Sequence, residues 1–147
     1  MAAHPVKERR NKIMCGIVGY VGAKECTAIL VNSLTKLEYR GYDSAGIAVF
    51  EGDRIKTVKA KGKLKEGLIK KLENEPHFTA TAGIGHTRWA THGEPSDINS
   101  HPIGNGRVSI VHNGIIENYR KLKEFLISKG YGFESQTDTE AVAKLLD

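Results

Sequence analysis

Two short strand-forming segments separated by three turn-forming residues constrain the fold more than any other feature of this sequence. Residues 45–50 (AGIAVF) and 54–60 (RIKTVKA) flank Glu51-Gly52-Asp53. Apolar and β-branched runs on both sides of a glycine-containing turn predict a β-hairpin. The fold should therefore contain antiparallel sheet. No apolar run reaches the roughly 18–20 residues of a membrane span, so a transmembrane protein is not expected.

Further strands and helices are expected on both sides of this hairpin. Apolar, β-branched composition predicts strands at 13–21, 81–86 and 107–112. Leucines and other apolar residues at helical spacing predict helices at 27–37, 64–72 and 117–128. Thr137 and Glu140 form a capping-box pattern that predicts one more helix. The chain should thus combine α and β elements, with a long polar loop at 87–106 of a length usually associated with function.

Composition narrows the class of protein. A chain of 147 residues suffices for one domain. Its two cysteines cannot build a disulfide framework, and no secretory signal is visible, so a cytoplasmic protein is expected. Residues 1–14 hold four basic side chains and one acid and so supply +3 of the net charge of +5. Because the remaining chain is nearly neutral, we expect no nucleic-acid binding.

The sequence also leads to expectations about the N-terminal and C-terminal segments. Residues 1–12 show no periodicity, and Met14 directly precedes Cys15 as a start codon would. We therefore expect residues 1–14, the leader, to be flexible and absent from the mature protein. The last helix runs to Asp147 without a capping or turn signal. This indicates a domain at 15–147 that is incomplete at its C-terminus and belongs to a longer protein.

Cys15 is the first candidate catalytic residue. A cysteine in a strand is most often a small buried hydrophobic residue. The alternative is a nucleophile, with Gly16 allowing a ligand to approach the thiol closely. A thiol nucleophile needs a base, and an N-terminal α-amine has a suitable ordinary pKa, about 7.7–8.0. Cys15 would have that amine only if the mature chain began there.

A second group of candidates lies in the segment 85–93 (GHTRWATHG). Arg88 could bind a carboxylate through both guanidinium N–H groups, and Trp89 could form the wall of a pocket. A strand-exit loop with ordinary hydrogen-bonded polar groups would also explain the segment. Histidines could alternatively bind a metal, the candidates being His86, His92, His101 and His112. Their spacing matches no usual metal motif, so no metal is expected.

Asn113-Gly114 and Asp138 are two further candidates for functional residues. Asn113-Gly114 is most simply a hairpin turn, but a side-chain amide beside a backbone N–H is also what an oxyanion hole requires. Asp138 sits at the expected start of the last helix, where it would complement the helix dipole or bind an ammonium group. Together these groups suit the cleavage of the side-chain amide of an amino acid.

Five segments, in this order, resemble the glutaminase domain of the glutamine–fructose-6-phosphate aminotransferases, a family of class II glutamine amidotransferases. They are MCGIVGY (14–20), LEYRGYDSAGIA (37–48), GHTRWATHGEPS (85–96), HNGIIENY (112–119) and SQTDTE (135–140). The resemblance covers essentially all of 14–147. It implies an α+β fold of the N-terminal-nucleophile hydrolase type, an αββα sandwich of two antiparallel sheets, truncated here at the C-terminus.

The resemblance also implies a role for individual residues. Cys15 would be the N-terminal nucleophile, with Asn113 and Gly114 stabilising the oxyanion and Arg40 in a supporting role nearby. Arg88 would hold the α-carboxylate of glutamine and Asp138 its α-ammonium group. Trp89, Thr91 and His92 would line the same pocket. No metal and no cofactor is implied.

The implied function is glutamine hydrolysis that supplies ammonia for the conversion of fructose 6-phosphate to glucosamine 6-phosphate. The sugar-phosphate domains would follow on the same full-length chain, which we expect to form a homo-oligomer. Two alternatives stay open. The chain could be a catalytically silent glutamine-binding or partner module, because Cys15 is not N-terminal as written. It could also belong to another class II amidotransferase, such as an amidophosphoribosyltransferase.

Overall fold

A four-stranded antiparallel sheet forms the centre of the computed structural model, which describes residues 15–40, 42–89 and 94–147. The elements are β1 (Gly16–Val21), α1 (Thr27–Lys36), a 3₁₀ turn (Glu38–Arg40), β2 (Ser44–Glu51), β3 (Arg54–Lys61), α2 (Leu68–Leu72), β4 (Ala82–Arg88), β5 (Ile103–Gly104), β6 (Ser109–Ile110), α3 (Tyr119–Ser128) and α4 (Thr139–Leu146). The strand order is β1-β4-β2-β3, and β5 pairs with β6 in a second, two-stranded antiparallel sheet.

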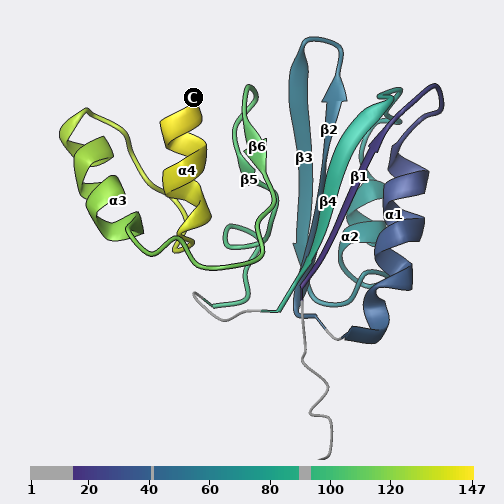
Figure 1. Cartoon of the computed structure of the whole chain (residues 1–147). Coiled ribbons are helices and arrows are strands. Elements are labelled where there is room, and N and C mark those ends of the chain that lie inside the picture. Colours follow the sequence, from purple (N-terminus) through teal and green to yellow (C-terminus); the bar gives the residue numbers. More distant parts are fainter. Residues whose placement is uncertain (1–14, 41, 90–93) are drawn as a thin grey trace, which may run out of the picture.

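The elements stack in layers (Figure 1). Helices α1 and α2 cover one face of the large sheet, the β5–β6 ribbon lies on the other side, and α3 and α4 lie beyond that ribbon. The order helix, sheet, sheet, helix agrees with the expected αββα arrangement. Among the described residues, no helix combines the length and hydrophobicity that crossing a membrane requires.

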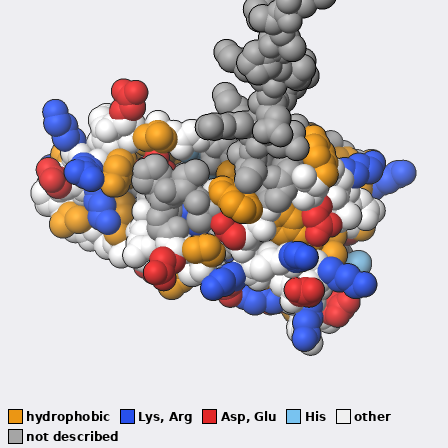
Figure 2. Space-filling model, turned by 90° about the horizontal axis from the view of Figure 1, so that it is seen from below, with side chains coloured by type: hydrophobic (Ala, Val, Ile, Leu, Met, Phe, Trp, Pro, Cys, Tyr) orange, Lys and Arg blue, Asp and Glu red, His pale blue; other side chains and the backbone are white. Residues whose placement is uncertain are grey.

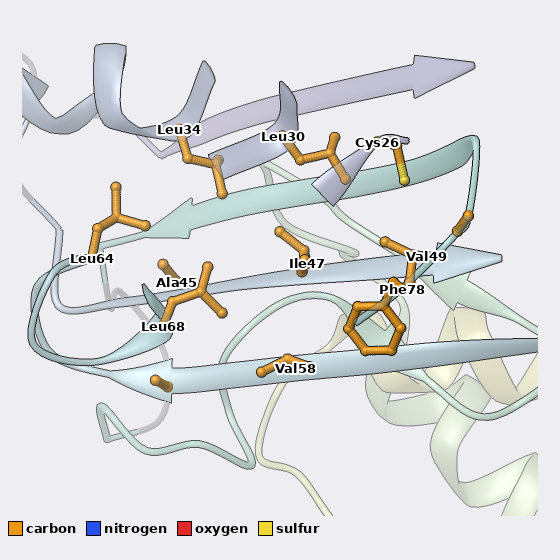
Figure 3. Close-up of a cluster of buried hydrophobic side chains, with 12 residues drawn as sticks. Cys26, Leu30, Leu34, Ala45, Ile47, Val49, Val58, Leu64, Leu68 and Phe78 are labelled. Atoms are coloured by element: carbon orange, nitrogen blue, oxygen red, sulfur yellow. The ribbon is translucent and has the colours of Figure 1, made fainter. Parts of the chain in front are cut away.

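The main hydrophobic core lies between the large sheet and its two helices (Figure 3). Helix α1 contributes Leu30 and Leu34, which are at most 1% exposed and lie on one helical face, as the leucine spacing predicts. Strand β2 contributes Ala45, Ile47 and Val49, which point to the same side because side chains alternate along a strand. This core fixes the large sheet on which the site is built.

The hairpin at the centre of the sequence forms as expected. Glu51 pairs with Arg54, which leaves Gly52 and Asp53 in the turn. Gly52 has a φ of 65°, a conformation that glycine adopts without steric cost. The predicted strand at 81–86 also forms, but it extends to Arg88. The extension matters because it places Arg88 on the rigid sheet rather than in a loop.

Three expectations are wrong in detail. Helix α2 has only five residues and begins at Leu68, because Gly67 before it adopts a non-helical conformation. The strand expected at 107–112 contracts to Ser109–Ile110, and its partner β5 lies inside the segment expected to be loop. The capping box does not form. Asp138 precedes α4 without a side-chain cap, and Glu140 instead accepts hydrogen bonds from Glu134 N and Ser135 N at 2.9 and 2.6 Å.

A glycine on β2 lets the chain cross close to the large sheet. Gly46 pairs with His86 of β4, and a Cβ at Gly46 would collide with the carbonyl oxygen of His101. The absence of a side chain thus allows the segment around His101, which leads into β5, to pack directly on the sheet. This crossing brings His101 next to His86, with their ring centroids 4.5 Å apart.

Candidate active site

Cys15 lies directly before β1, at the start of the edge strand of the large sheet. Its side chain is partly exposed. The sulfur accepts a hydrogen bond from Trp89 N at 3.2 Å. Strand β1 fixes this position by pairing with β4, so that Gly16 is opposite Thr87. Cys15 is therefore not a core residue of a strand but a thiol held at a strand end.

Gly16 has a different role from the one expected. A Cβ at Gly16 would lie 2.6 Å from Leu37 Cδ1 and 2.9 Å from Thr87 Oγ1. Its N–H also donates to Thr87 Oγ1 at 3.1 Å. The glycine thus gives room to protein side chains packed against the start of β1, rather than to an approaching ligand.

Arg88 is the last residue of β4 and is only 6% exposed. It pairs with Ser44 of β2, and its carbonyl oxygen accepts a hydrogen bond from Asp43 N at 2.8 Å. Trp89 follows and is 40% exposed. The backbone of the arginine is thereby anchored to β2 and the residue before it, whereas the indole next to it remains accessible. Thr91 and His92, also expected here, lie outside the described residues.

The Asn113 side chain links two parts of the site. Its Nδ2 donates to the carbonyl oxygen of Cys15 at 3.0 Å, and its Oδ1 is 2.8 Å from His86 Nε2. Gly114 follows with a φ of 149°, which strains any residue with a side chain. No described residue accepts a hydrogen bond from the Gly114 N–H. Asn113-Gly114 is not the hairpin turn of the simplest interpretation, since it leads to α3.

Two buried histidines lie beneath Asn113. His86 is 1% and His101 5% exposed. Burial, together with nearby Arg88, lowers the pKa of His86 to about 4. Burial, with the neighbouring His86 and Arg88, lowers the pKa of His101 to about 3. Both rings are therefore neutral at pH 7. In the described ranges, no cluster of three or more His, Cys, Asp or Glu side chains is placed to hold a metal ion.

Asp138 lies across from Cys15 at the start of α4. Its Oδ2 accepts a hydrogen bond from Ile116 N at 2.6 Å, which ties α4 to the segment after Gly114. The Thr139 hydroxyl is within 3.5 Å of both Asp138 Oδ1 and His112 Nδ1. The carboxylate is thus held in place by the backbone and keeps further lone pairs for a ligand.

These groups surround one small hollow of about 60 Å³. Its lining comprises Cys15, His86, Arg88, Trp89, His101, His112, Asn113, Gly114, Thr137, Asp138 and Thr139. Six of the expected site residues therefore meet at one place. Arg40 lies in the 3₁₀ turn, and its side chain falls outside the described part of the structure. The sequence pattern indicated His86, His101 and His112 only as candidate metal ligands, and it assigned Thr139 no role in the site.

Comparisons with known proteins identify the family to which the chain belongs. Residues 73–147, half of the chain, match the model of the family described as glutamine amidotransferase domain. The glutamine–fructose-6-phosphate aminotransferase of Clostridium perfringens is 59% identical over 138 residues, and that of Thermus thermophilus is 53% identical over 136 residues. Each match covers 91% of this chain and 22% of the relative.

Two solved structures share the fold. The glutamine phosphoribosylpyrophosphate amidotransferase of B. subtilis superimposes with a TM-score of 0.72 at 28% identity, over 88% of this chain and 28% of that one. A structure described as the allosteric regulatory enzyme of purine biosynthesis gives a TM-score of 0.75 at 30% identity, over 88% and 29%. The chain belongs to the family of glutamine amidotransferase domains. Its fold is the expected N-terminal-nucleophile type, and the resemblance seen in the motifs is confirmed.

Proposed function

We propose that this chain is the amide-cleaving part of a glutamine-dependent aminotransferase that makes glucosamine 6-phosphate from fructose 6-phosphate. One observation carries the proposal: a thiol, an amide donor, a buried arginine and an anchored carboxylate line a single hollow. The chain spans about a fifth of the length of the curated relatives it matches. The sugar-phosphate chemistry accordingly belongs to domains that follow in the full-length protein.

In the proposed reaction, Cys15 Sγ attacks the carboxamide carbon of glutamine, and its proton passes to the α-amine of Cys15, directly or through water. The tetrahedral oxyanion accepts hydrogen bonds from Asn113 Nδ2 and Gly114 N. When the C–N bond breaks, the amine returns the proton and ammonia leaves. Water then hydrolyses the thioester, which yields glutamate and restores the thiol. The released ammonia passes to the sugar-phosphate domain.

The substrate is held by its α-substituents. Arg88 binds the α-carboxylate, because a guanidinium pairs with a carboxylate through two parallel hydrogen bonds. Asp138 binds the α-ammonium group. Trp89, Thr91 and His92 line the same pocket, and Arg40 supports the nucleophile. No cofactor and no metal takes part.

The wider setting is also a proposal. The full-length protein is a cytoplasmic homo-oligomer that binds neither nucleic acid nor membranes. On the face seen in Figure 2, acidic and basic side chains are intermingled, whereas surfaces that bind nucleic acid concentrate basic side chains. This mixture supports the proposal for that face.

The sugar phosphate that accepts the ammonia distinguishes the proposed function from its nearest alternative. We expect the full-length protein, beginning at Cys15, to release glutamate from glutamine and to form glucosamine 6-phosphate when given fructose 6-phosphate. An amidophosphoribosyltransferase would instead consume phosphoribosyl pyrophosphate. Glutamate and both sugar products are measured in parallel reactions. If product forms from phosphoribosyl pyrophosphate and not from fructose 6-phosphate, the chain is instead part of an amidophosphoribosyltransferase.

Replacing Asp138 with asparagine tests the proposed ammonium site. The amide oxygen of asparagine can still accept the hydrogen bond from Ile116 N, so the start of α4 should remain in place. The negative charge is lost, and we expect KM for glutamine to rise about 10- to 100-fold, as a hydrogen bond to a charged group contributes about 1.5–3 kcal/mol. Steady-state kinetics measure the change, and an unaltered KM would contradict the role of Asp138.

A further inference from the structure

The hydrogen bond between His86 and Asn113 has no role in the reaction described above. Asn113 can act as an oxyanion donor only if its Nδ2, and not its Oδ1, is turned toward the reacting carbon. The two ends of an asparagine amide have nearly the same shape, so packing alone does not select between them. Some polar contact must therefore fix the orientation.

The carbonyl oxygen of Cys15 provides the first constraint. It lies 3.0 Å from Asn113 Nδ2 and can only accept a hydrogen bond. The NH₂ end of the amide must therefore face Cys15, which places Oδ1 toward His86 Nε2 at 2.8 Å. Since Oδ1 is also only an acceptor, the proton of neutral His86 must be on Nε2.

His86 is well placed to supply the second constraint. It lies within β4, paired with Ile17 on one side and Gly46 on the other, so its backbone belongs to the sheet. Its ring stacks on His101, whose Nδ1 accepts a hydrogen bond from His112 N at 3.3 Å. The imidazole is thus held by the sheet below and by a second ring beside it.

We infer that His86 is a positioning residue for the oxyanion site. Its Nε2–H holds Oδ1 of Asn113, which keeps one Nδ2 hydrogen on the Cys15 carbonyl and leaves the other for the oxyanion. The inference rests on the proposed function, because that function assigns Asn113 as a donor. His86 itself touches neither the substrate nor the reacting atoms in this scheme.

The variant His86→Phe tests the inference by keeping an aromatic ring beside His101 while removing the N–H. In the full-length protein beginning at Cys15, we expect kcat for glutamine hydrolysis to fall about 10- to 100-fold, less than the 10²–10³-fold typical of deleting a donor outright. KM should stay within about two-fold, since the α-substituents of glutamine are bound elsewhere. His86→Gln, which restores an N–H donor, should recover most of the lost kcat.

A double-mutant cycle separates positioning from a general structural role. If His86 acts through Asn113, adding His86→Phe to Asn113→Ala should lower kcat by less than about two-fold. Urea unfolding of each variant verifies that it is folded. If His86→Phe does not fold, His86→Leu replaces it in the cycle.

The kinetic results distinguish failure of the positioning role from failure of the proposed function. Equal losses of kcat in both backgrounds, a rise in KM alone, or no recovery with His86→Gln would each overturn the positioning role while leaving the proposed function intact. An unsubstituted protein that releases no ammonia from glutamine would overturn the proposed function, and the inference with it.

Discussion

Replacing Cys15 with alanine in the full-length protein will abolish ammonia release from glutamine. We expect a loss of at least about 10³-fold, because no covalent intermediate can form without the nucleophile. Isomerisation of fructose 6-phosphate should continue, because we propose that it takes place in another domain. Glutamate formation and sugar isomerisation are measured on the same preparation. Unchanged glutamine hydrolysis would refute the assignment of Cys15.

Cys26 provides the matched control for this substitution. It is the other cysteine of the chain, is 0% exposed and belongs to the hydrophobic core beside α1. Cys26→Ala removes one buried sulfur, so it should lower the urea midpoint slightly while ammonia release continues. An electrophilic glutamine analogue should modify Cys15 and leave Cys26 unmodified, which peptide mass spectrometry can establish.

Removing the leader will raise glutamine hydrolysis by at least about 10²-fold, the lower range of a general base. When residue 14 precedes Cys15, the Cys15 nitrogen is part of an amide and is not basic. A free α-amine has an ordinary pKa of about 7.7–8.0 and accepts the thiol proton in its neutral form. Activity of the form beginning at Cys15 should therefore increase with pH up to about pH 8. Values of kcat/KM at several pH values measure both effects.

A single alanine placed before Cys15 is the sharpest control. It restores the amide linkage without the bulk of the leader, so it should be as inactive as the chain that begins at Met1. If the alanine-extended form is active, the leader acts by obstruction and the amine is not the base. If the form beginning at Cys15 binds glutamine but does not cleave it, the chain is a silent glutamine-binding module.

Local sequence patterns predict the elements whose neighbours lie close in the chain. The hairpin around Gly52 and the buried face of α1 depend on turn chemistry and on helical spacing, both of which a short window contains. Helix α2 and strand β5 are different. Gly67 shortens the first by its backbone conformation, and β5 exists because β6 pairs with it. Neither effect is visible in apolar periodicity.

In the site, too, local sequence patterns predict some features, whereas others depend on contacts between distant parts of the chain. Cys15, Arg88, Asn113 and Asp138 stand in motifs that indicate their chemistry, and the structure brings them to one hollow. The link between His86 and Asn113 could not be predicted, because it depends on which residues face each other across the sheet and on the crossing above Gly46. A histidine in a sequence indicates possible ligands and bases, but its role as a neutral donor depends on burial.

The pairing of β1 with β4 also sets the order in which the site can form during synthesis. The Gly16 N–H and the Thr87 hydroxyl that it contacts are separated by 71 residues, and contacts of such sequence separation form late in folding. On the ribosome, residues near Cys15 emerge long before β4 can cover them. If the leader is removed at that stage, the amine of Cys15 is freed before β1 and β4 can pair, and the nucleophile reaches its place in the site only afterwards.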